Sequence, residues 1–237
     1  MATVFRSKTP APPPPSEYAF PSATKGRGPH GIVGTGADFA PGTLLAAYRA
    51  GIFPWPMSDA AEETPWCSPR ARALRLLDPQ PAWSRSVRRA RKKAFSVSFD
   101  RAFAEVVDRC RVRAGGTWIL PELAEGMRAL HALGWAHSVE VWNTAGELVG
   151  GLYGLALGAT FAGESMFHVE TDASKVAFST LADALADAGY HFVDAQVPTP
   201  HLASLGCIEV ARDDYLERLA RALRVDAPFP HRPPPSR

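Results

Sequence analysis

The segment from residue 137 to residue 197 constrains the fold most, because it predicts several strands with a single helix among them. A hairpin is expected first, since two strand-like runs flank the turn residues Asn143-Thr144-Ala145-Gly146. The expected strands cover 137–142, 148–157, 159–166 and 190–197, and the expected helix covers 174–188. Antiparallel strands followed by a helix and one more strand predict a mixed sheet, and therefore an α/β (α+β) fold.

The last expected strand, 190–197, carries polar residues where a core strand would normally carry aliphatic ones. Asp194 and Gln196 lie two residues apart, so their side chains should share one face of the strand. A buried carboxylate needs hydrogen bonds, and the Gln196 amide is a ready donor. Its carbonyl oxygen would then be an oriented acceptor that can position an amine and take up its proton. Taken alone, the pair favours the alternative that Asp194 caps a turn or pairs with a surface arginine.

Length and composition narrow the class of protein. At 237 residues the chain can form one large domain or two small ones, and its hydrophobic fraction of 46% is ordinary for a globular protein. No segment approaches the roughly 20 apolar residues of a transmembrane helix, and the N-terminus shows no signal-peptide pattern. Three widely spaced cysteines, Cys67, Cys110 and Cys207, fit neither a disulfide framework nor a zinc site. We therefore expect a cytoplasmic protein without a metal.

Composition shifts divide the chain into four parts. Residues 1–30, rich in proline, serine and glycine, are predicted to be a disordered tail, and residues 228–237 a second loose end. Between them we expect a small domain over 31–74, with a helix over 41–50, and a larger domain over 75–227. No amphipathic stripe is left unexplained, so a monomer is expected.

Positive charge is concentrated in one short stretch, although the net charge of the whole chain is only +2. If Ser84 caps a helix, four of these basic residues fall at the spacing that places them on one helix face. Such a stripe suits a phosphate backbone, and a solvated helix face is the alternative. The basic residues of this stretch are Arg85, Arg88, Arg89, Arg91, Lys92 and Lys93.

Several short segments occur in an order that is hard to meet by chance. They are Gly51-Ile52-Phe53-Pro54-Trp55, Gly116-Thr117-Trp118, Gly163-Glu164-Ser165-Met166-Phe167, Asp172-Ala173-Ser174-Lys175, Asp194-Ala195-Gln196 and His201-Leu202-Ala203-Ser204-Leu205-Gly206. Taken together they resemble the leucyl/phenylalanyl-tRNA–protein transferases, and the resemblance covers nearly everything from about Gly31 to Leu223.

The resemblance implies a fold and a reaction. The fold is a small N-terminal α+β domain followed by an acetyltransferase-like (GNAT-type) domain. The reaction moves leucine or phenylalanine, with methionine as a further candidate, from aminoacyl-tRNA to the free α-amine of a protein that begins with arginine or lysine. The product is marked for degradation by the N-end rule. No cofactor is implied, and the partners are the aminoacyl-tRNA and the acceptor protein.

The same resemblance assigns roles to individual residues. Asp194 would orient Gln196, which would draw a proton from the incoming amine or only position it. Glu164 would hold the α-amine of either the aminoacyl group or the acceptor. The matching positions of the aminoacyl and adenosine pocket are Trp55, Trp118, Leu152, Phe161, Glu164, Ser165 and Met166. Those of the tRNA-binding cluster are Arg85, Arg88, Arg89, Lys92 and Lys93.

Two other functions remain open at this stage. An acyl-CoA-dependent N-acyltransferase would need a glycine-rich pyrophosphate loop that opens a helix. The helix expected after the hairpin instead starts at Asp172, which repels phosphate. A non-catalytic tRNA-binding module would also explain the basic stripe and the tryptophans. It would give no reason to bury Asp194 beside Gln196.

Overall fold

Two β-sheets organise the part of the protein that the computed structural model describes, residues 9–55, 63–112 and 119–231. The strands are β1 (Ile32–Thr35), β2 (Phe53–Pro54), β3 (Pro65–Cys67), β4 (Ala71–Leu76), β5 (Ser96–Phe99), β6 (Ala136–Trp142), β7 (Leu148–Leu157), β8 (Thr160–His168), β9 (Phe192–Asp194) and β10 (Ile208–Ala211). The helices are the short 3-10 helix η1 (Ala23–Lys25), α1 (Pro41–Arg49), α2 (Arg85–Ala90), α3 (Phe103–Arg111), α4 (Pro121–Ala132), α5 (Ala173–Asp187), α6 (Pro200–Ser204) and α7 (Arg212–Ala222).

The larger sheet has the strand order β10-β4-β9-β8-β7-β6-β5. Its neighbouring strands are antiparallel except β8 and β9, which are parallel, so the predicted mixed sheet is confirmed. The β8–β9 pairing is short and joins Thr160–Ala162 to Phe192–Asp194. After these residues the two strands stop pairing, and the sheet opens between them at the end where Gln196 follows.

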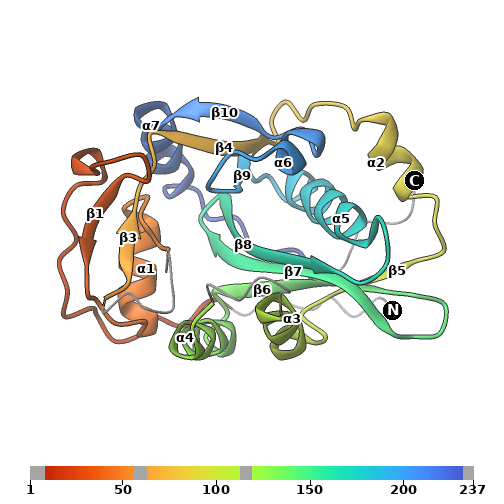
Figure 1. Cartoon of the computed structure of the whole chain (residues 1–237), viewed down its shortest axis with the longest axis horizontal. Coiled ribbons are helices and arrows are strands. Elements are labelled where there is room, and N and C mark those ends of the chain that lie inside the picture. The colour runs from red at the N-terminus through yellow and green to blue at the C-terminus, as the bar shows by residue number, and fades with distance from the viewer. Residues whose placement is uncertain (1–8, 56–62, 113–118, 232–237) are drawn as a thin grey trace.

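Helices cover both faces of this sheet. Figure 1 shows α5 on one side of the β7–β8 hairpin and α3 and α4 on the other, and α5 and α3 both contact β6 and β7. The buried face of α5 is apolar, and Gly189 follows the end of the helix with a φ of 83°, a left-handed conformation that favours glycine. Each face of the sheet therefore has its own apolar core. None of the helices in the described ranges could span a bilayer.

The smaller sheet, with the order β1-β3-β2, forms a lobe with α1. The predicted helix over 41–50 is confirmed as α1, and Gly51 follows its C-cap with a φ of 76°. The predicted domain boundary between residues 74 and 75 falls inside β4, which pairs with β9 and β10 of the larger sheet. The last residues assigned to the small domain thus pair within the larger one.

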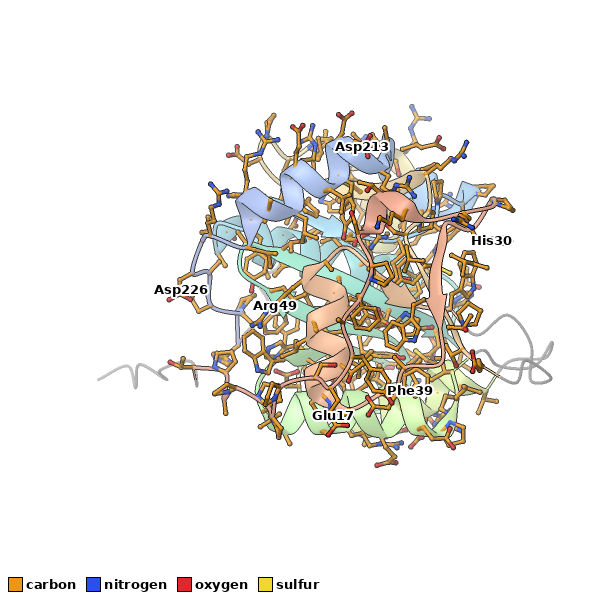
Figure 2. All side chains as sticks on the ribbon, turned by 90° about the vertical axis from the view of Figure 1, so that its left-hand side faces the viewer. Glu17, His30, Phe39, Arg49, Asp213 and Asp226 are labelled. Atoms are coloured by element: carbon orange, nitrogen blue, oxygen red, sulfur yellow. The ribbon has the colours of Figure 1, made fainter. Side chains whose placement is uncertain are left out.

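The described residues of the predicted disordered tail, 9–30, are mostly exposed, but several of them contact the rest of the chain. Ala11 is held at both of its backbone polar groups, by the carbonyl of Leu133 and by the indole N–H of Trp135. Phe20 lies against Trp66 with ring centroids 4.9 Å apart. Figure 2 shows this segment, in which Glu17 and His30 are labelled, lying over the small lobe beside α1. Its prolines restrict the unfolded chain, so ordering the segment costs less entropy than its composition suggests.

The predicted C-terminal loose end also contacts the core through one of its described residues, 228–231. Phe229 is only 6% exposed and packs in the core on the α5 side of the larger sheet. A single aromatic residue in a proline-rich segment is a weak sequence signal, because burial here depends on a slot built by distant strands.

Candidate active site

A cavity of about 470 Å³ lies where β8 and β9 part. The predicted pocket residues Trp55, Leu152, Phe161, Glu164, Ser165 and Met166 line it, together with the catalytic candidate Gln196. The predicted Trp118 lies outside the described residues. The other catalytic candidate, Asp194, is buried directly behind the cavity wall and does not line it.

The deep end of the cavity is apolar because of strand register. Leu152 on β7 is paired with Met166 on β8, and Phe161 on β8 is paired with Val193 on β9, so all four side chains belong to the core on the α5 side of the sheet. Helix α5 closes this end with Phe178 and Leu181. Burial of an aliphatic or aromatic side chain here is favourable, whereas a charged side chain would lose its hydration without a partner.

The carboxylate of Asp194 has every acceptor position occupied by the protein. The Arg72 guanidinium donates to it twice, with Nε 2.8 Å from Oδ1 and Nη2 2.7 Å from Oδ2. Tyr215 Oη donates to Oδ2 at 2.9 Å, and the backbone N–H of Gln196 donates to Oδ1 at 2.9 Å. Arg72 and Asp194 are 1% and 2% exposed. No lone pair of the Asp194 carboxylate therefore remains for a ligand.

This arrangement corrects the predicted contact between the side chains of Asp194 and Gln196. Strand β9 ends at Asp194, and Gln196 takes a left-handed backbone conformation with a φ of 63°, so the two side chains do not share a strand face. Asp194 orients Gln196 through its backbone N–H, as in an Asx turn. Strand β4 fixes the same loop, since Ala73 exchanges backbone hydrogen bonds with Ala195 and Gln196.

The side chain of Gln196 is oriented by Glu164. The Gln196 amide nitrogen donates to Oε1 of Glu164 at 2.7 Å. This bond uses one of the two amide N–H groups and fixes the orientation of the amide, so the carbonyl oxygen remains as an acceptor for a ligand in the cavity. In this geometry Glu164, and not Asp194, is the carboxylate that holds the Gln196 amide.

Arg72 connects the small lobe to the larger sheet. Its guanidinium is stacked between the rings of Phe53, 4.7 Å away, and Tyr215, 4.2 Å away, and it donates to the carbonyl of Gly51. Burial alone would lower the pKa of Arg72, but the Asp194 carboxylate reverses this and holds the pKa above its usual value. The guanidinium is thus permanently charged. Phe53, which lines the cavity, is positioned by the same contact.

Glu164 is a buried titratable group of the cavity. Burial raises the pKa of its carboxyl to about 7, although the nearby Tyr48 hydroxyl and Gln196 amide oppose the shift. Its Oε2 atom and the Oη of Tyr48 are both buried, and no other group in the described part of the chain bonds to either of them. An ammonium group that entered the cavity would give Oε2 a partner and favour the ionised form.

Replacing Glu164 with glutamine should flatten the pH dependence of stability. A carboxyl whose folded pKa lies above its unfolded value binds more protons when folded, so stability falls as pH rises from about 4.5 to about 7. Relative to Glu164→Gln, wild type should lose roughly 1–3 kcal/mol more stability across this window. Urea unfolding at several pH values measures the free energy of unfolding of both proteins. The same dependence on pH in the two would contradict a raised pKa for Glu164.

The basic residues form a cluster outside the cavity. Ser84 is the N-cap of α2, as predicted, and its Oγ accepts from the N–H of Val87 at 3.4 Å. The three arginines are exposed on α2. The helix ends at Ala90, so the prediction that Lys92 continues the helical stripe is wrong; Lys92 and Lys93 follow in a turn. We call these residues the basic cluster: Arg85, Arg88, Arg89, Lys92 and Lys93.

The cluster is joined to α5, which also contributes residues to the cavity. Helix α2 packs against α5. Lys93 pairs with Asp172 at 2.9 Å, and Lys175 pairs with the same carboxylate at 2.7 Å. Asp172 occupies the N-cap position of α5 but its side chain does not cap the helix. The predicted repulsion of phosphate at this end is therefore reduced, because two lysines neutralise the carboxylate.

Comparison with known proteins assigns this architecture to a family. The sequence model described as leucyl/phenylalanyl-tRNA protein transferase matches residues 76–220, and the model of its N-terminal domain matches residues 37–70. The chain belongs to this family. The two ranges include every predicted site residue, from Trp55 to Gln196, and also Tyr215, whereas Arg72 lies in the short interval between them.

Individual members of the leucyl/phenylalanyl-tRNA–protein transferase family match over most of their length. The protein from Maridesulfovibrio salexigens is 48% identical over 203 residues, which cover 84% of each chain. The protein from Syntrophobacter fumaroxidans is 50% identical over 197 residues, 80% of this chain and 82% of the relative. The protein from Stutzerimonas stutzeri is 45% identical over 219 residues, 91% of this chain and 92% of the relative. All three are named leucyl/phenylalanyl-tRNA–protein transferase.

Solved structures show more distant similarity. L-PGS from Bacillus licheniformis matches with a TM-score of 0.41 and 13% identity, over 56% of this chain and 48% of that one. A tandem GNAT protein from the clavulanic acid biosynthesis pathway matches with a TM-score of 0.34 and 14% identity, over 73% of this chain and 59% of that one.

Several residues that build the site were not predicted from the sequence. They are Arg72 and Tyr215, which hold Asp194, and Tyr48, which lies beside Glu164. Arg72 is the one with a usable signal, because it lies in the strand segment Ala71–Leu76 at a position that is buried and that an apolar residue would normally fill. A carboxylate partner stabilises a buried arginine, and Asp194 was already expected to be buried.

Proposed function

We propose that the protein transfers leucine or phenylalanine, with methionine as a further substrate, from aminoacyl-tRNA to the α-amine of proteins that begin with arginine or lysine. The products would enter N-end-rule degradation, and the protein would act in the cytoplasm as a monomer. The observation that carries the proposal is the cavity itself, which joins an apolar end to a polar end made by Gln196 and Glu164. Membership of the transferase family supports the same reaction.

The proposed chemistry is aminolysis of an ester without a covalent intermediate. The acceptor amine has an unperturbed pKa near 8, so a useful fraction is neutral at physiological pH. Its nitrogen attacks the ester carbonyl carbon and gives up a proton, the carbon–oxygen bond to the ribose breaks, and the ribose oxygen takes up that proton and leaves as a hydroxyl. The 2′-hydroxyl of the tRNA can relay that proton. Such a reaction depends on positioning and modest proton handling.

Each polar residue has a proposed part in this step. The carbonyl oxygen of Gln196 accepts a hydrogen bond from the attacking amine and aligns its lone pair with the ester. Glu164 holds Gln196 and offers Oε2 to an amine of the aminoacyl group or of the acceptor. Asp194, bound by Arg72 and Tyr215, fixes the backbone that carries Gln196. Asp194 thus contributes by position and not as a base.

The apolar end selects the transferred amino acid, and Trp55 would stack on the terminal adenosine. Stacking on a base is worth about 1–3 kcal/mol and does not depend on sequence, as a shared tRNA end requires. Trp55 lies at the cavity, with the ring of His30 at 4.9 Å and that of Phe53 at 6.1 Å. Selection among apolar amino acids should overlap, because one methylene is worth only about 1–3 kcal/mol.

The decisive experiment measures transfer of labelled leucine from leucyl-tRNA to two peptides. One peptide begins with arginine, and the control differs only by an N-terminal glycine. Transfer to the arginine peptide alone supports both the reaction and the acceptor rule. Salt-sensitive tRNA binding without transfer to either peptide would favour a tRNA-binding module, and transfer from an acyl-CoA would favour the N-acyltransferase.

The basic cluster should contribute a salt-dependent part of tRNA affinity. Replacing Arg85 and Arg89 with glutamine removes two exposed charges without altering the core. We expect weaker tRNA binding and a decrease of about 1–2 in the slope of log affinity against log salt concentration. Filter binding over a salt series measures the slope. Replacing Arg221 and Arg224 with glutamine, also exposed but at the end of α7, is the matched control; an equal effect there would contradict a localised tRNA site.

A further inference from the structure

The chain after α7 returns to the larger sheet and buries one side chain. Residues 223–231 are exposed or half-buried except Phe229, which is 6% exposed. The hydroxyl of Tyr190 donates to the carbonyl of Ala227 at 3.1 Å and fixes the segment two residues before Phe229. Phe229 lies outside residues 76–220, the range that the family's sequence model matches.

Phe229 enters a slot lined by aromatic rings. Its ring is stacked on the imidazole of His137, with centroids 3.8 Å apart and an interplanar angle of 8°. His137 is itself fixed, with Nδ1 2.7 Å from a carboxylate oxygen of Asp100. Phe99 packs against the same phenylalanine with ring centroids 5.7 Å apart. The position of Phe229 is therefore determined from two sides.

The third ring beside Phe229 belongs to Phe161, a residue that lines the cavity. The ring centroids of Phe229 and Phe161 are 5.9 Å apart. Phe161 lines the cavity and is completely buried. Because interiors are close-packed, Phe161 cannot move toward Phe229 unless Phe229 gives up space.

We propose that Phe229 sets the depth of the amino-acid cavity by supporting Phe161, and that it thereby sets the preference between leucine and phenylalanine. This inference rests on the proposed function, since it concerns the side chain of the transferred amino acid. Phe229 would not touch that side chain. It is a specificity-determining residue that acts through Phe161, and it belongs to a segment beyond the matched range of the family.

The test compares Phe229→Ala and Phe229→Leu with wild type. Shortening the side chain leaves space into which Phe161 can retreat, so the deeper cavity should favour the longer phenylalanine side chain. We expect the ratio of kcat/KM for phenylalanyl-tRNA over leucyl-tRNA to rise about tenfold in Phe229→Ala and less in Phe229→Leu. Val225→Ala is the matched control, because Val225 lies in the same segment and is exposed.

A second readout separates this inference from the proposed function. The affinities of leucyl- and phenylalanyl-adenosine with an amide in place of the ester report the cavity without any transfer. If wild type binds both compounds but transfers neither, the proposed function fails while the affinity ratio still tests Phe229. A purely structural role would lower both affinities and both rates by the same factor, and an unchanged ratio in folded Phe229→Leu would overturn the inference.

Discussion

Replacing Gln196 with alanine is expected to slow aminoacyl transfer by about 10²- to 10³-fold while leaving tRNA affinity unchanged. The variant removes the carbonyl oxygen that the cavity offers to an amine, and it leaves the apolar end and the basic cluster intact. The loss should appear in kcat at saturating aminoacyl-tRNA. Single-turnover transfer to the arginine peptide, together with filter binding of the tRNA, measures the two quantities separately.

The control for this prediction is another glutamine with a similar bond. The Gln80 amide nitrogen donates to Asp183 at 3.0 Å, and Gln80 does not line the cavity. Gln80→Ala therefore removes an amide with a similar hydrogen bond at a position outside the site. Asp194→Ala should lose transfer as Gln196→Ala does, because the backbone N–H of Gln196 loses its acceptor. A Gln196→Ala variant that keeps more than about a tenth of the wild-type rate would contradict a role in catalysis.

Much of the fold follows from local patterns in the sequence. The hairpin β6–β7, strand β8 and helix α5 were predicted within two residues at each end, because long periodic runs with turn residues between them are strong signals. The residues of the apolar cavity were predicted from a resemblance. Their own side chains could not distinguish a binding pocket from ordinary core, since both require aliphatic and aromatic residues.

The remaining features depend on contacts between distant parts of the chain. Strands β2, β3, β9 and β10 have two to four residues each, and such short strands are formed only when their partners are present. The Gln196 side chain was predicted to reach Asp194 because continuous strand geometry was assumed. Strand β9 stops one residue after Val193, and the turn that follows sends the amide to Glu164.

Replacing Arg72 with alanine is expected to destabilise the protein by about 3–5 kcal/mol, the cost of leaving a buried carboxylate without its partner. The pair is nearly inaccessible to water, and two hydrogen bonds join Arg72 to Asp194. Urea unfolding measures the change. Arg91→Ala is the matched control, since its ion pair with Asp183 is partly exposed and should contribute about 0–1 kcal/mol.

A double variant distinguishes the charge of Arg72 from its role in the site. Arg72→Met with Asp194→Leu removes both charges and keeps similar volume, and we expect it to recover most of the lost stability. Transfer should stay as slow as in Gln196→Ala, because the backbone N–H of Gln196 still lacks the carboxylate that orients it. If the double variant regained transfer along with stability, the hydrogen bonds of Arg72 and Tyr215 to Asp194 would contribute to folding alone. The orientation of Gln196 would then come entirely from Glu164 and β4.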